Sequence, residues 1–265
     1  MIKLSIIVSY YKALENLKLI LKALNSQSVS GFEVIVSEDD NNPETIDFLK
    51  KESKYYSFPI LHVHQEVDNG FRKNMMLNKS IKASNAETLA FIDGDCIPHK
   101  HFVKGYINNI EEGVMLKGRR VMLGAIITNK IVEDRSLEHL KTIKILLSDS
   151  NRKKEALYLG NNSLILTMKD KGLLGCNWGI KKKHLIEING FDEDYVRAAV
   201  GEDTDVEWRL KRLGIGSKSV KNKAIVYHLH HERSYSIEGV EINRALLKEK
   251  IALDNFKCIN GLEKS

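Results

Sequence analysis

The sequence predicts an α/β protein in which helices cover both faces of a mostly parallel sheet, built as a single continuous domain. Two observations support this fold class. Short apolar runs of the kind that form fully buried strands recur through the first hundred residues. Between these runs, apolar residues are spaced as on one face of a helix. Strands that alternate with helices in this way form parallel sheets.

The predicted elements of the N-terminal part follow one another in regular alternation. The strands are residues 4–9, 32–37, 60–64 and 88–92. The first helix has its apolar residues on one face, at positions 17, 20, 21 and 24. Asn42 followed by Pro43 is typical of a helix start, with asparagine as the N-cap and proline in the first turn. A third helix is predicted over residues 71–81.

The rest of the chain alternates less regularly. Helices are predicted over residues 102–110, 131–149, 201–213 and 237–256, and extended segments over residues 114–123 and 223–230. Residues 150–172 are polar and basic, which is typical of a surface excursion. The chain is therefore expected to have an N-terminal half of residues 1–100, a second half of residues 101–235 and a C-terminal helical tail of residues 236–265.

The composition is that of a globular protein with anionic partners. Apolar residues make up 43% and charged residues 29% of the 265 residues, which is enough for a substantial core. The formal net charge of +6 favours nucleotide diphosphates, nucleic acid or an acidic membrane surface, without choosing among them.

Cysteine content predicts a reducing, cytoplasmic environment. Cys96, Cys176 and Cys258 are an odd number of cysteines at wide spacing. The sequence therefore predicts neither a disulfide framework nor a zinc-ligand pair.

Any membrane contact is expected to be peripheral, at the inner face of the plasma membrane. The apolar run at the N-terminus is short for a signal peptide and lacks a cleavage site. No apolar run approaches the roughly 20 residues of a membrane span. The basic residues 117–120 and 152–154 are candidates for contact with a lipid surface or an anionic glycan, and equally for a solvated surface.

Polar residues follow each of the predicted parallel strands. Ligands bind outside the carboxyl ends of such strands, so these residues are the first candidates for a site. They are Ser9-Tyr10-Tyr11, Glu38-Asp39-Asp40, the segment 68–74 with Arg72 and Lys73, and Asp93-Gly94-Asp95. Carboxylates accept hydrogen bonds from a nucleobase or a ribose, and cations contact phosphates. The carboxylates on either side of Gly94 are suited to hold Mn²⁺ or Mg²⁺, which prefer oxygen ligands and often share them with substrate phosphates.

Each of these segments also has a purely structural interpretation. Asp-Gly is a common turn pair, Arg72-Lys73 is typical of a solvated helix start, and Glu38-Asp39-Asp40 is typical of a helix cap. Taken alone, Asp93-Gly94-Asp95 fits a turn as well as a metal site. An acidic pair at the end of a buried strand is repulsive unless a cation is bound. All four segments at one sheet edge together favour a site for a nucleotide and a metal.

The second half contributes a group of acids at a predicted helix start, Gly201-Glu202-Asp203-Thr204-Asp205. Acids in a first helical turn complement the helix dipole, which explains one or two of them better than three. An inverting displacement needs a carboxylate to take the proton of the attacking hydroxyl. The segment is therefore the candidate source of a general base.

Three histidines lie at the end of the last predicted strand. Closely spaced histidines at a strand end are candidate metal ligands, although a lone histidine is more often structural. Alternation along the strand places His228 and His230 on one face, and His231 follows directly. The spacing does not decide which of the three points into the site.

These residues together resemble family 2 glycosyltransferases of the GT-A fold, which has a Rossmann-like sheet, over residues 3–235. Within the family, the chain is most similar to the bacterial chondroitin-polymerase type and the animal β-1,4-galactosyltransferase type. The matching segments are Ile6-Ile7-Val8-Ser9-Tyr10, Asn69-Gly70-Phe71-Arg72-Lys73-Asn74, Phe91-Ile92-Asp93-Gly94-Asp95, Gly175-Cys176-Asn177-Trp178, Asn189-Gly190-Phe191-Asp192-Glu193 and Gly201-Glu202-Asp203-Thr204-Asp205. The last two, with a helix end at residues 209–214, are specific in combination.

The resemblance implies a reaction and its partners. It implies an inverting, metal-dependent transfer of a hexosyl group from a nucleotide-sugar, with a UDP-sugar expected, in polysaccharide biosynthesis. The acceptor would be a hydroxyl of a glycan or of a lipid-linked molecule. Residues 1–100 would bind the nucleotide-sugar, and residues 101–235 would bind the acceptor and carry the catalytic base.

The resemblance also implies roles for individual residues. Those implied to hold the uridine are Ser9, Tyr10, Glu38 and Asp39, with Arg72 near the nucleotide. Those implied to ligate Mn²⁺ or Mg²⁺ are Asp95 and His228, with Asp93 on the metal or the ribose. Those implied in catalysis are Asp203 as the base and Glu202 on the acceptor. Those implied to line the sugar pocket are Asn177 and Trp178. The family often has Asp-Asp-Gly-Ser after its second strand, whereas this chain has Glu38-Asp39-Asp40-Asn41, so the acid that meets the base stays open.

Two other function classes fit parts of the sequence. A sugar-phosphate nucleotidyltransferase also combines a parallel nucleotide-binding sheet with a metal. It would carry a glycine-rich phosphate loop where this chain has Ser9-Tyr10-Tyr11-Lys12. A non-catalytic nucleic-acid-binding or sugar-binding protein would fit the basic charge. The acids at the expected ligand edge, and both Asp95 and Asp203, argue against it, so no nucleic-acid partner is expected.

Overall fold

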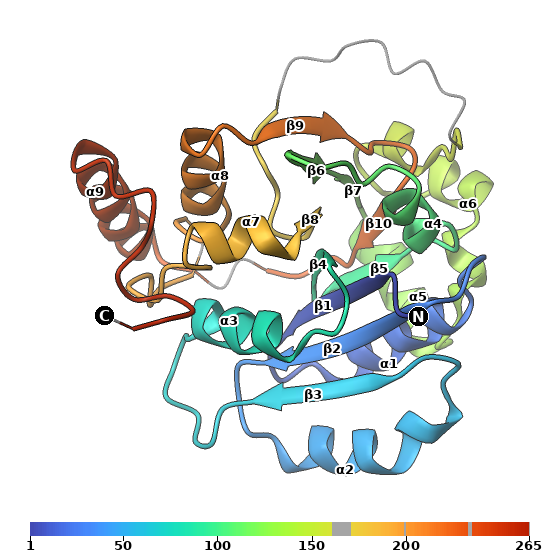
Figure 1. The fold of residues 1–265 in the computed structure, drawn as a ribbon. Helices are drawn as coiled ribbons and strands as arrows, with labels where there is room; N and C mark the ends of the chain where they lie inside the picture. The colour runs from blue at the N-terminus through green and yellow to red at the C-terminus, as the bar shows by residue number, and fades with distance from the viewer. Residues whose placement is uncertain (161–170, 199, 233–234, 265) are drawn as a thin grey trace.

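The computed structural model describes residues 1–160, 171–198, 200–232 and 235–264 (Figure 1). A seven-stranded sheet in the order β3-β2-β1-β4-β8-β6-β9 forms its centre, together with a three-stranded sheet in the order β5-β10-β7. The sheet is mostly parallel and carries helices on both faces, which confirms the predicted α/β class.

The four strands of the N-terminal half pair in parallel, as predicted. They are β1 (Leu4–Tyr10), β2 (Phe32–Glu38), β3 (Ile60–His64) and β4 (Thr88–Asp93). The helical segments between them are α1 (Leu14–Asn25), α2 (Pro43–Glu52), η1 (Ser53–Tyr55) and α3 (Lys73–Ala83). The register places Ser9 beside both Ser37 and Asp93. The carboxyl ends of β1, β2 and β4 therefore meet at one edge of the sheet.

Two hydrophobic clusters lie on opposite faces of this sheet. Ile6 belongs to the cluster that contains Leu17 of α1, and Ile7 to the cluster that contains Leu77 of α3. Alternation along β1 therefore buries both of its faces, as expected for a strand that is mostly apolar and carries no charged residue. The predicted N-cap is confirmed, since the side chain of Asn42 accepts hydrogen bonds from two N–H groups of the first turn of α2.

The elements after β4 complete the large sheet and supply the small one (Figure 1). Their strands are β5 (Cys96–Pro98), β6 (Val114–Lys117), β7 (Arg119–Met122), β8 (Asn177–Lys181), β9 (Gly216–Ser219) and β10 (Ile225–His228). Their helical segments are α4 (Phe102–Ile107), α5 (Ala125–Glu133), η2 (Leu137–Leu140), α6 (Thr142–Leu147), η3 (Lys153–Ala156), α7 (Lys182–Glu187), α8 (Asp203–Arg212) and, in the tail, α9 (Ile237–Ala252). Strand β8 runs antiparallel to β4 and carries the sheet into its second half.

Several predicted boundaries in the second half were wrong. The helix predicted over residues 131–149 begins earlier, at Ala125, and is broken after Glu133, where Arg135 has a φ of 46° in the left-handed region. The last predicted strand ends at His228 rather than at residue 230. Part of the surface excursion predicted over residues 150–172 lies outside the described residues. Within the described ranges, no helix is long and apolar enough to cross a membrane.

Candidate active site

A cavity of about 1070 Å³ opens at the carboxyl ends of β1, β2 and β4. It brings together five of the predicted site residues: Ser9, Tyr10, Asp39, Asp93 and Asp95. Helix α5, the segment after β10 and helix α9 supply other parts of its wall. The volume lies at the upper end of small-molecule sites, so it has room for a ligand as large as a nucleotide-sugar.

Gly94 allows the turn after β4 to pack directly on the end of β1. The N–H of Gly94 donates a hydrogen bond to the carbonyl oxygen of Ser9 at 2.6 Å. A Cβ atom at this position would lie 2.9 Å from the same oxygen, which is closer than real Cβ atoms approach. The glycine therefore serves a close backbone approach that brings Asp93 and Asp95 to the cavity.

The acids after β2 lie in different environments. Asp39 lines the cavity and accepts hydrogen bonds from the backbone N–H of Arg72 at 2.9 Å and from the amide of Gln65 at 2.8 Å. Burial raises the pKa of Asp39 to about 6. Glu38 is fully buried, with Oε2 2.6 Å from Nε2 of His62. Of these two acids, Asp39 is thus the one that faces the cavity.

Lys73, rather than Arg72, brings a cation into the site. The guanidinium of Arg72 donates to the carbonyl oxygen of Phe71 at 2.8 Å. Lys73 lines the cavity, and its Nζ donates to Oδ1 of Asp93 and to Oε1 of Glu202, both at 2.8 Å. Burial alone would lower the pKa of Lys73, but these two carboxylates hold it well above its usual value.

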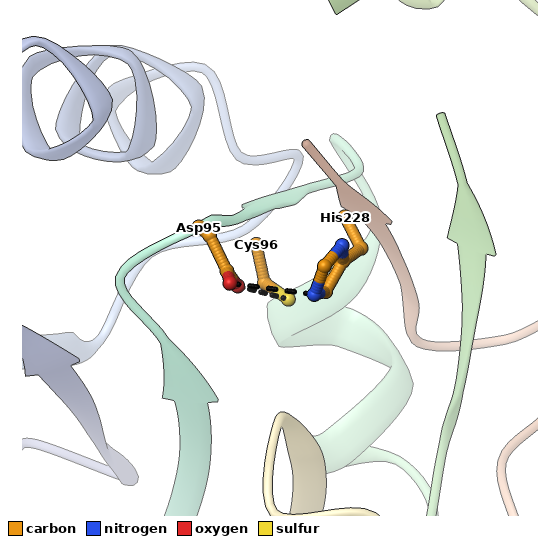
Figure 2. A group of neighbouring side chains, drawn as sticks. All are labelled: Asp95, Cys96 and His228. Carbon is orange, nitrogen blue, oxygen red and sulfur yellow. Dashed lines mark hydrogen bonds and ion pairs between the residues drawn. The ribbon is translucent and has the colours of Figure 1, made fainter. Parts of the chain in front are cut away.

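Three potential metal ligands lie together beside the cavity: Asp95, Cys96 and His228 (Figure 2). Their ligand atoms, an oxygen, a sulfur and a nitrogen, all lie within 4.8 Å of one another. Sγ of Cys96 lies 3.1 Å from Oδ1 of Asp95, and Nε2 of His228 lies 3.3 Å from Oδ2. A carboxylate, a thiol and an imidazole are all ligand groups of divalent cations, so this trio fits a metal ion. Asp93 lies outside the trio, with its carboxylate on Lys73.

Two of the three candidate histidines face Asp95. Besides His228, His231 places Nε2 at 2.9 Å from Oδ2 of Asp95, and this hydrogen bond raises the pKa of His231 to about 9. Burial opposes ionisation of Asp95, yet the hydrogen bond from His231 and the nearby His228 lower its pKa to about 2. Because β10 ends at His228, strand alternation does not extend to His230, whose backbone N–H donates to Thr128 at 2.9 Å.

The acids at the start of α8 divide into two kinds. Oδ2 of Asp203 accepts the backbone N–H of Gly175 at 3.0 Å. A narrow void of about 10 Å³ has in its lining Ser9, Lys73, Trp178, Glu202 and Asp203. Ser9 and Lys73 also line the large cavity, so Glu202 and Asp203 lie next to it. Asp205 is instead buried against Arg209, with a contact of 2.6 Å, and anchors the helix.

The two predicted sugar-pocket residues are both buried. Trp178 stacks on Phe91 with 4.5 Å between ring centroids, and it still lines the narrow void. The amide of Asn177 donates to one carbonyl in β7 at 2.7 Å and to another just before β10 at 2.9 Å. Its Oδ1 accepts the hydroxyl of Tyr106 at 2.6 Å. Asn177 therefore joins the two sheets, and its geometry does not support the prediction that it lines a sugar pocket.

Three residues of the site were not singled out by sequence reasoning. Lys73 was grouped with Arg72 as one cationic segment, although the helix start separates their directions. The spacing of Cys96 from the other cysteines gives no sign of a ligand role. The spacing of His231 does not separate it from His228 and His230. Their directions depend on the ends of α3 and β10 and on the pairing of β5 with β10, which sequence patterns locate least well.

The structure resembles solved glycosyltransferases of the GT-A fold. It is similar to mannosyltransferase PcManGT from Pyrobaculum calidifontis in complex with GDP-Man and Mn²⁺, with a TM-score of 0.62 and 13% identity, over 96% of this chain and 67% of that one. It is also similar to GalNAc-T7 with UDP, GalNAc and Mn²⁺, with a TM-score of 0.64 and 10% identity, over 94% of this chain and 48% of that one. Residues 1–349 of S. aureus TarS in complex with UDP-GlcNAc give a TM-score of 0.61 at 17% identity, over 94% and 66% of the two chains. The fold of this chain is therefore the GT-A fold.

The sequence profile described as Glycosyl transferase family 2 matches residues 5–188, and the chain belongs to this family. Residues 156–232 match a second profile, the N-terminal domain of galactosyltransferase. The chain is 24% identical to the uncharacterized glycosyltransferase YfnE of Bacillus subtilis over 298 residues, 98% of this chain and 74% of that protein. It is 29% identical to glycosyltransferase AglE of Haloferax volcanii over 120 residues, 44% and 38% of the two chains. The family favours the glycosyltransferase interpretation over a nucleotidyltransferase.

Proposed function

We propose that the chain is an inverting, metal-dependent glycosyltransferase that moves a hexosyl group from a UDP-sugar to a hydroxyl of a glycan or lipid-linked acceptor. The observation that carries the proposal is the position of Asp95, which both lines the large cavity and belongs to the metal-ligand trio. A diphosphate in the cavity would therefore lie against a cation held at Asp95. Two of the similar structures contain Mn²⁺ with a sugar nucleotide or with UDP and a sugar.

The nucleotide would be bound by the N-terminal half, residues 1–100. Ser9, Tyr10 and Asp39 line the cavity at the strand ends and would hold the nucleoside. The backbone N–H of Arg72 orients the carboxylate of Asp39, so Arg72 would act near the nucleotide through its main chain. Glu38 lies behind this surface and would support it from the sheet.

Mn²⁺ or Mg²⁺ would be held by Asp95 and His228. The bound ion would supply charge neutralisation as the diphosphate leaves. Asp93 would then contact the ribose, and Lys73 would exchange a carboxylate partner for a phosphate oxygen, since its ammonium faces the same cavity.

Asp203 would act as the general base in the second half, residues 101–235. It would take the proton of the acceptor hydroxyl as that oxygen attacks the anomeric carbon, and a single displacement of this kind inverts the configuration. Glu202, beside it, would bind the acceptor, and Trp178 would border the transferred sugar. The tail, residues 236–265, would close the cavity, because Glu238, Gly239 and Ile242 of α9 line it.

The acceptor and cellular setting are part of the same proposal. The match of residues 156–232 to a galactosyltransferase profile supports the chondroitin-polymerase and β-1,4-galactosyltransferase branch. The net charge of +6 suits an anionic glycan, or a lipid-linked acceptor at the inner face of the plasma membrane, in cytoplasmic polysaccharide biosynthesis.

The test is a panel of nucleotide-sugars assayed for hydrolysis and for thermal stabilisation with and without Mn²⁺. We expect one UDP-sugar to raise the melting temperature and to be hydrolysed slowly only when the metal is present. Asp95→Asn should lose both responses. If no nucleotide-sugar stabilises the wild-type chain in Mn²⁺, the proposal is wrong.

A further inference from the structure

One of the three ligand atoms beside the cavity is a sulfur atom. Cys96 is fully buried, and its Sγ lies 3.1 Å from Oδ1 of Asp95, whose Oδ2 lies 3.3 Å from Nε2 of His228. Two atoms bound to one tetrahedral ion at usual zinc-ligand distances are about 3.3 to 3.8 Å apart. These two separations, which involve the two oxygens of the Asp95 carboxylate, are close to those values, and all three ligand atoms lie within 4.8 Å of one another. One ion is therefore within reach of all three groups after shifts of their side chains (Figure 2).

Backbone pairing holds Cys96 and His228 in this arrangement. Strands β5 and β10 are antiparallel, and their register places His228 opposite Cys96. Directly opposed residues point to the same face of a sheet, with Cβ atoms about 4.5 to 5.5 Å apart. The carbonyl oxygen of Asp95 accepts the N–H of Leu229 at 2.9 Å, which ties the third member to the same strand end. The sulfur therefore takes its place through the fold and not through a flexible loop.

The trio has a closed side and an open side. Cys96 and His228 are buried, whereas the side chain of Asp95 keeps 24% of its surface exposed and lines the cavity. An ion held from within by sulfur and nitrogen would keep a coordination position open toward the cavity. Sites that bind a substrate through their metal have this arrangement, whereas structural sites are closed by protein ligands on all sides.

We infer that Cys96 is a metal ligand and that this centre prefers cations that accept sulfur, binding Co²⁺ or Zn²⁺ more tightly than Mn²⁺ and Mg²⁺ most weakly. The inference rests on the proposed metal site at Asp95 and His228. Thiolate and imidazole ligands select such ions, and carboxylate ligands alone would favour Mn²⁺ or Mg²⁺. When the ion binds, the S–H bond of Cys96 breaks, a sulfur–metal bond forms and the proton passes to solvent.

The experiment is a titration of the metal-free, full-length chain with Co²⁺, followed by absorption. The wild type should show a thiolate-to-cobalt charge-transfer band in the near ultraviolet and release a proton for each ion bound. Cys96→Ser should lose the band and bind Co²⁺ at least roughly tenfold more weakly, while its affinity for Mg²⁺ changes less. Cys258→Ser is the matched control, because Cys258 is also buried but its thiol contacts the carbonyl oxygen of Asn189 at 3.3 Å.

Cys176 requires its own variant, since this buried thiol interacts with that of Cys96. A band that survives in Cys96→Ser, or that disappears only in Cys176→Ser, overturns the inference. If Cys96→Ser does not fold, the titration of the wild type still tests the inference. Absence of the band or of proton release there means that Cys96 does not bind the ion as a thiolate. If the chain turns over a nucleotide-sugar with Mn²⁺ but shows no charge-transfer band with Co²⁺, this inference is wrong and the proposed function stands. If the band with Co²⁺ appears but no nucleotide-sugar is turned over, the assignment of Cys96 as a ligand stands and the proposed function is contradicted.

Discussion

Nζ of Lys73 lies 2.8 Å from Oε1 of Glu202, a residue 129 positions away along the chain. The same ammonium lies 2.8 Å from Oδ1 of Asp93 at the end of β4. One cation thus joins the N-terminal half, where the predicted nucleotide site lies, to the start of α8, where the predicted base lies. The three groups are largely buried, with side-chain exposures of 17%, 26% and 18% for Lys73, Asp93 and Glu202.

Removal of this ammonium should destabilise the protein more than removal of an exposed one. In Lys73→Met, Asp93 and Glu202 keep their burial and lose their cation, so we expect the free energy of unfolding to fall by roughly 2 kcal/mol, below the about 3 to 5 kcal/mol lost from a fully buried pair. Lys18→Met is the matched control, because the pair Lys18–Glu15 is more exposed and is worth under about 1 kcal/mol. Urea unfolding measures both. Equal losses in the two variants would contradict the role assigned to Lys73.

Asp203→Asn should separate chemistry from binding. Oδ2 of Asp203 accepts the N–H of Gly175, and an asparagine oxygen can accept the same bond, so the start of α8 should keep its structure. The amide cannot take a proton, and we expect the transfer rate to fall by about 10² to 10⁴-fold. Binding of the nucleotide-sugar, measured by calorimetry, should stay within a few-fold of wild type. Normal transfer by this variant would remove Asp203 as the base.

The first half of the fold was predictable because its strands and helices have strong periodic patterns. The second half was not, for particular reasons. Strand β9 (Gly216–Ser219) has no large apolar residue and exists only through its pairing with β6. Strand β8 contains Gly179, where a Cβ atom would lie 2.7 Å from the ring of Tyr106. Such strands are set by neighbours distant in sequence, which local patterns do not contain.

The site was predictable to the extent that it follows from strand ends. Asp39, Asp93 and Asp95 line the cavity because parallel strands end at one edge. The contacts of the Cys96 and Asn177 side chains could not be predicted from the positions of strand ends. Cys96 faces Asp95 through the register of β5 with β10, and Asn177 is fully bonded between two sheets. Sequence shows that these residues are present, whereas the pairing of strands decides what they contact.

The three histidines should differ in their contribution to metal binding. His228→Ala removes the imidazole of the trio and should raise the Mn²⁺ concentration needed for half-maximal thermal stabilisation by at least roughly 10 to 100-fold, because even groups that only orient a metal ligand cause a loss of this size. His230→Ala should change it only a few-fold, because His230 is outside the trio although it lines the cavity. His231→Ala should lie between them, since His231 contacts Asp95 at 2.9 Å. A larger effect at His230 than at His228 would reverse the assignment.

Asp39 should make stability depend on pH in an identifiable window. Burial raises its pKa to about 6 in the folded chain, against about 3.9 in an unfolded one. The folded state therefore holds the proton more tightly over this interval. Its contribution to the free energy of unfolding is fully present only below the unfolded pKa of about 3.9, and it is lost as the pH rises from there through 6. The loss amounts to about 3 kcal/mol for a shift of this size.

Asp39→Asn cannot titrate and isolates this contribution from that of other groups. We expect the unfolding free energy of the wild type, relative to that of Asp39→Asn, to fall by about 2 kcal/mol between pH 4.5 and 7.5, as measured by urea unfolding. Asp68→Asn is the control, because a hydrogen bond from Lys12 lowers the pKa of Asp68 and places its titration below this window. A difference for Asp39→Asn that stays constant across the window would mean that Asp39 is already ionised in the folded chain near pH 4, and that its hydrogen bonds from Arg72 and Gln65 outweigh its burial.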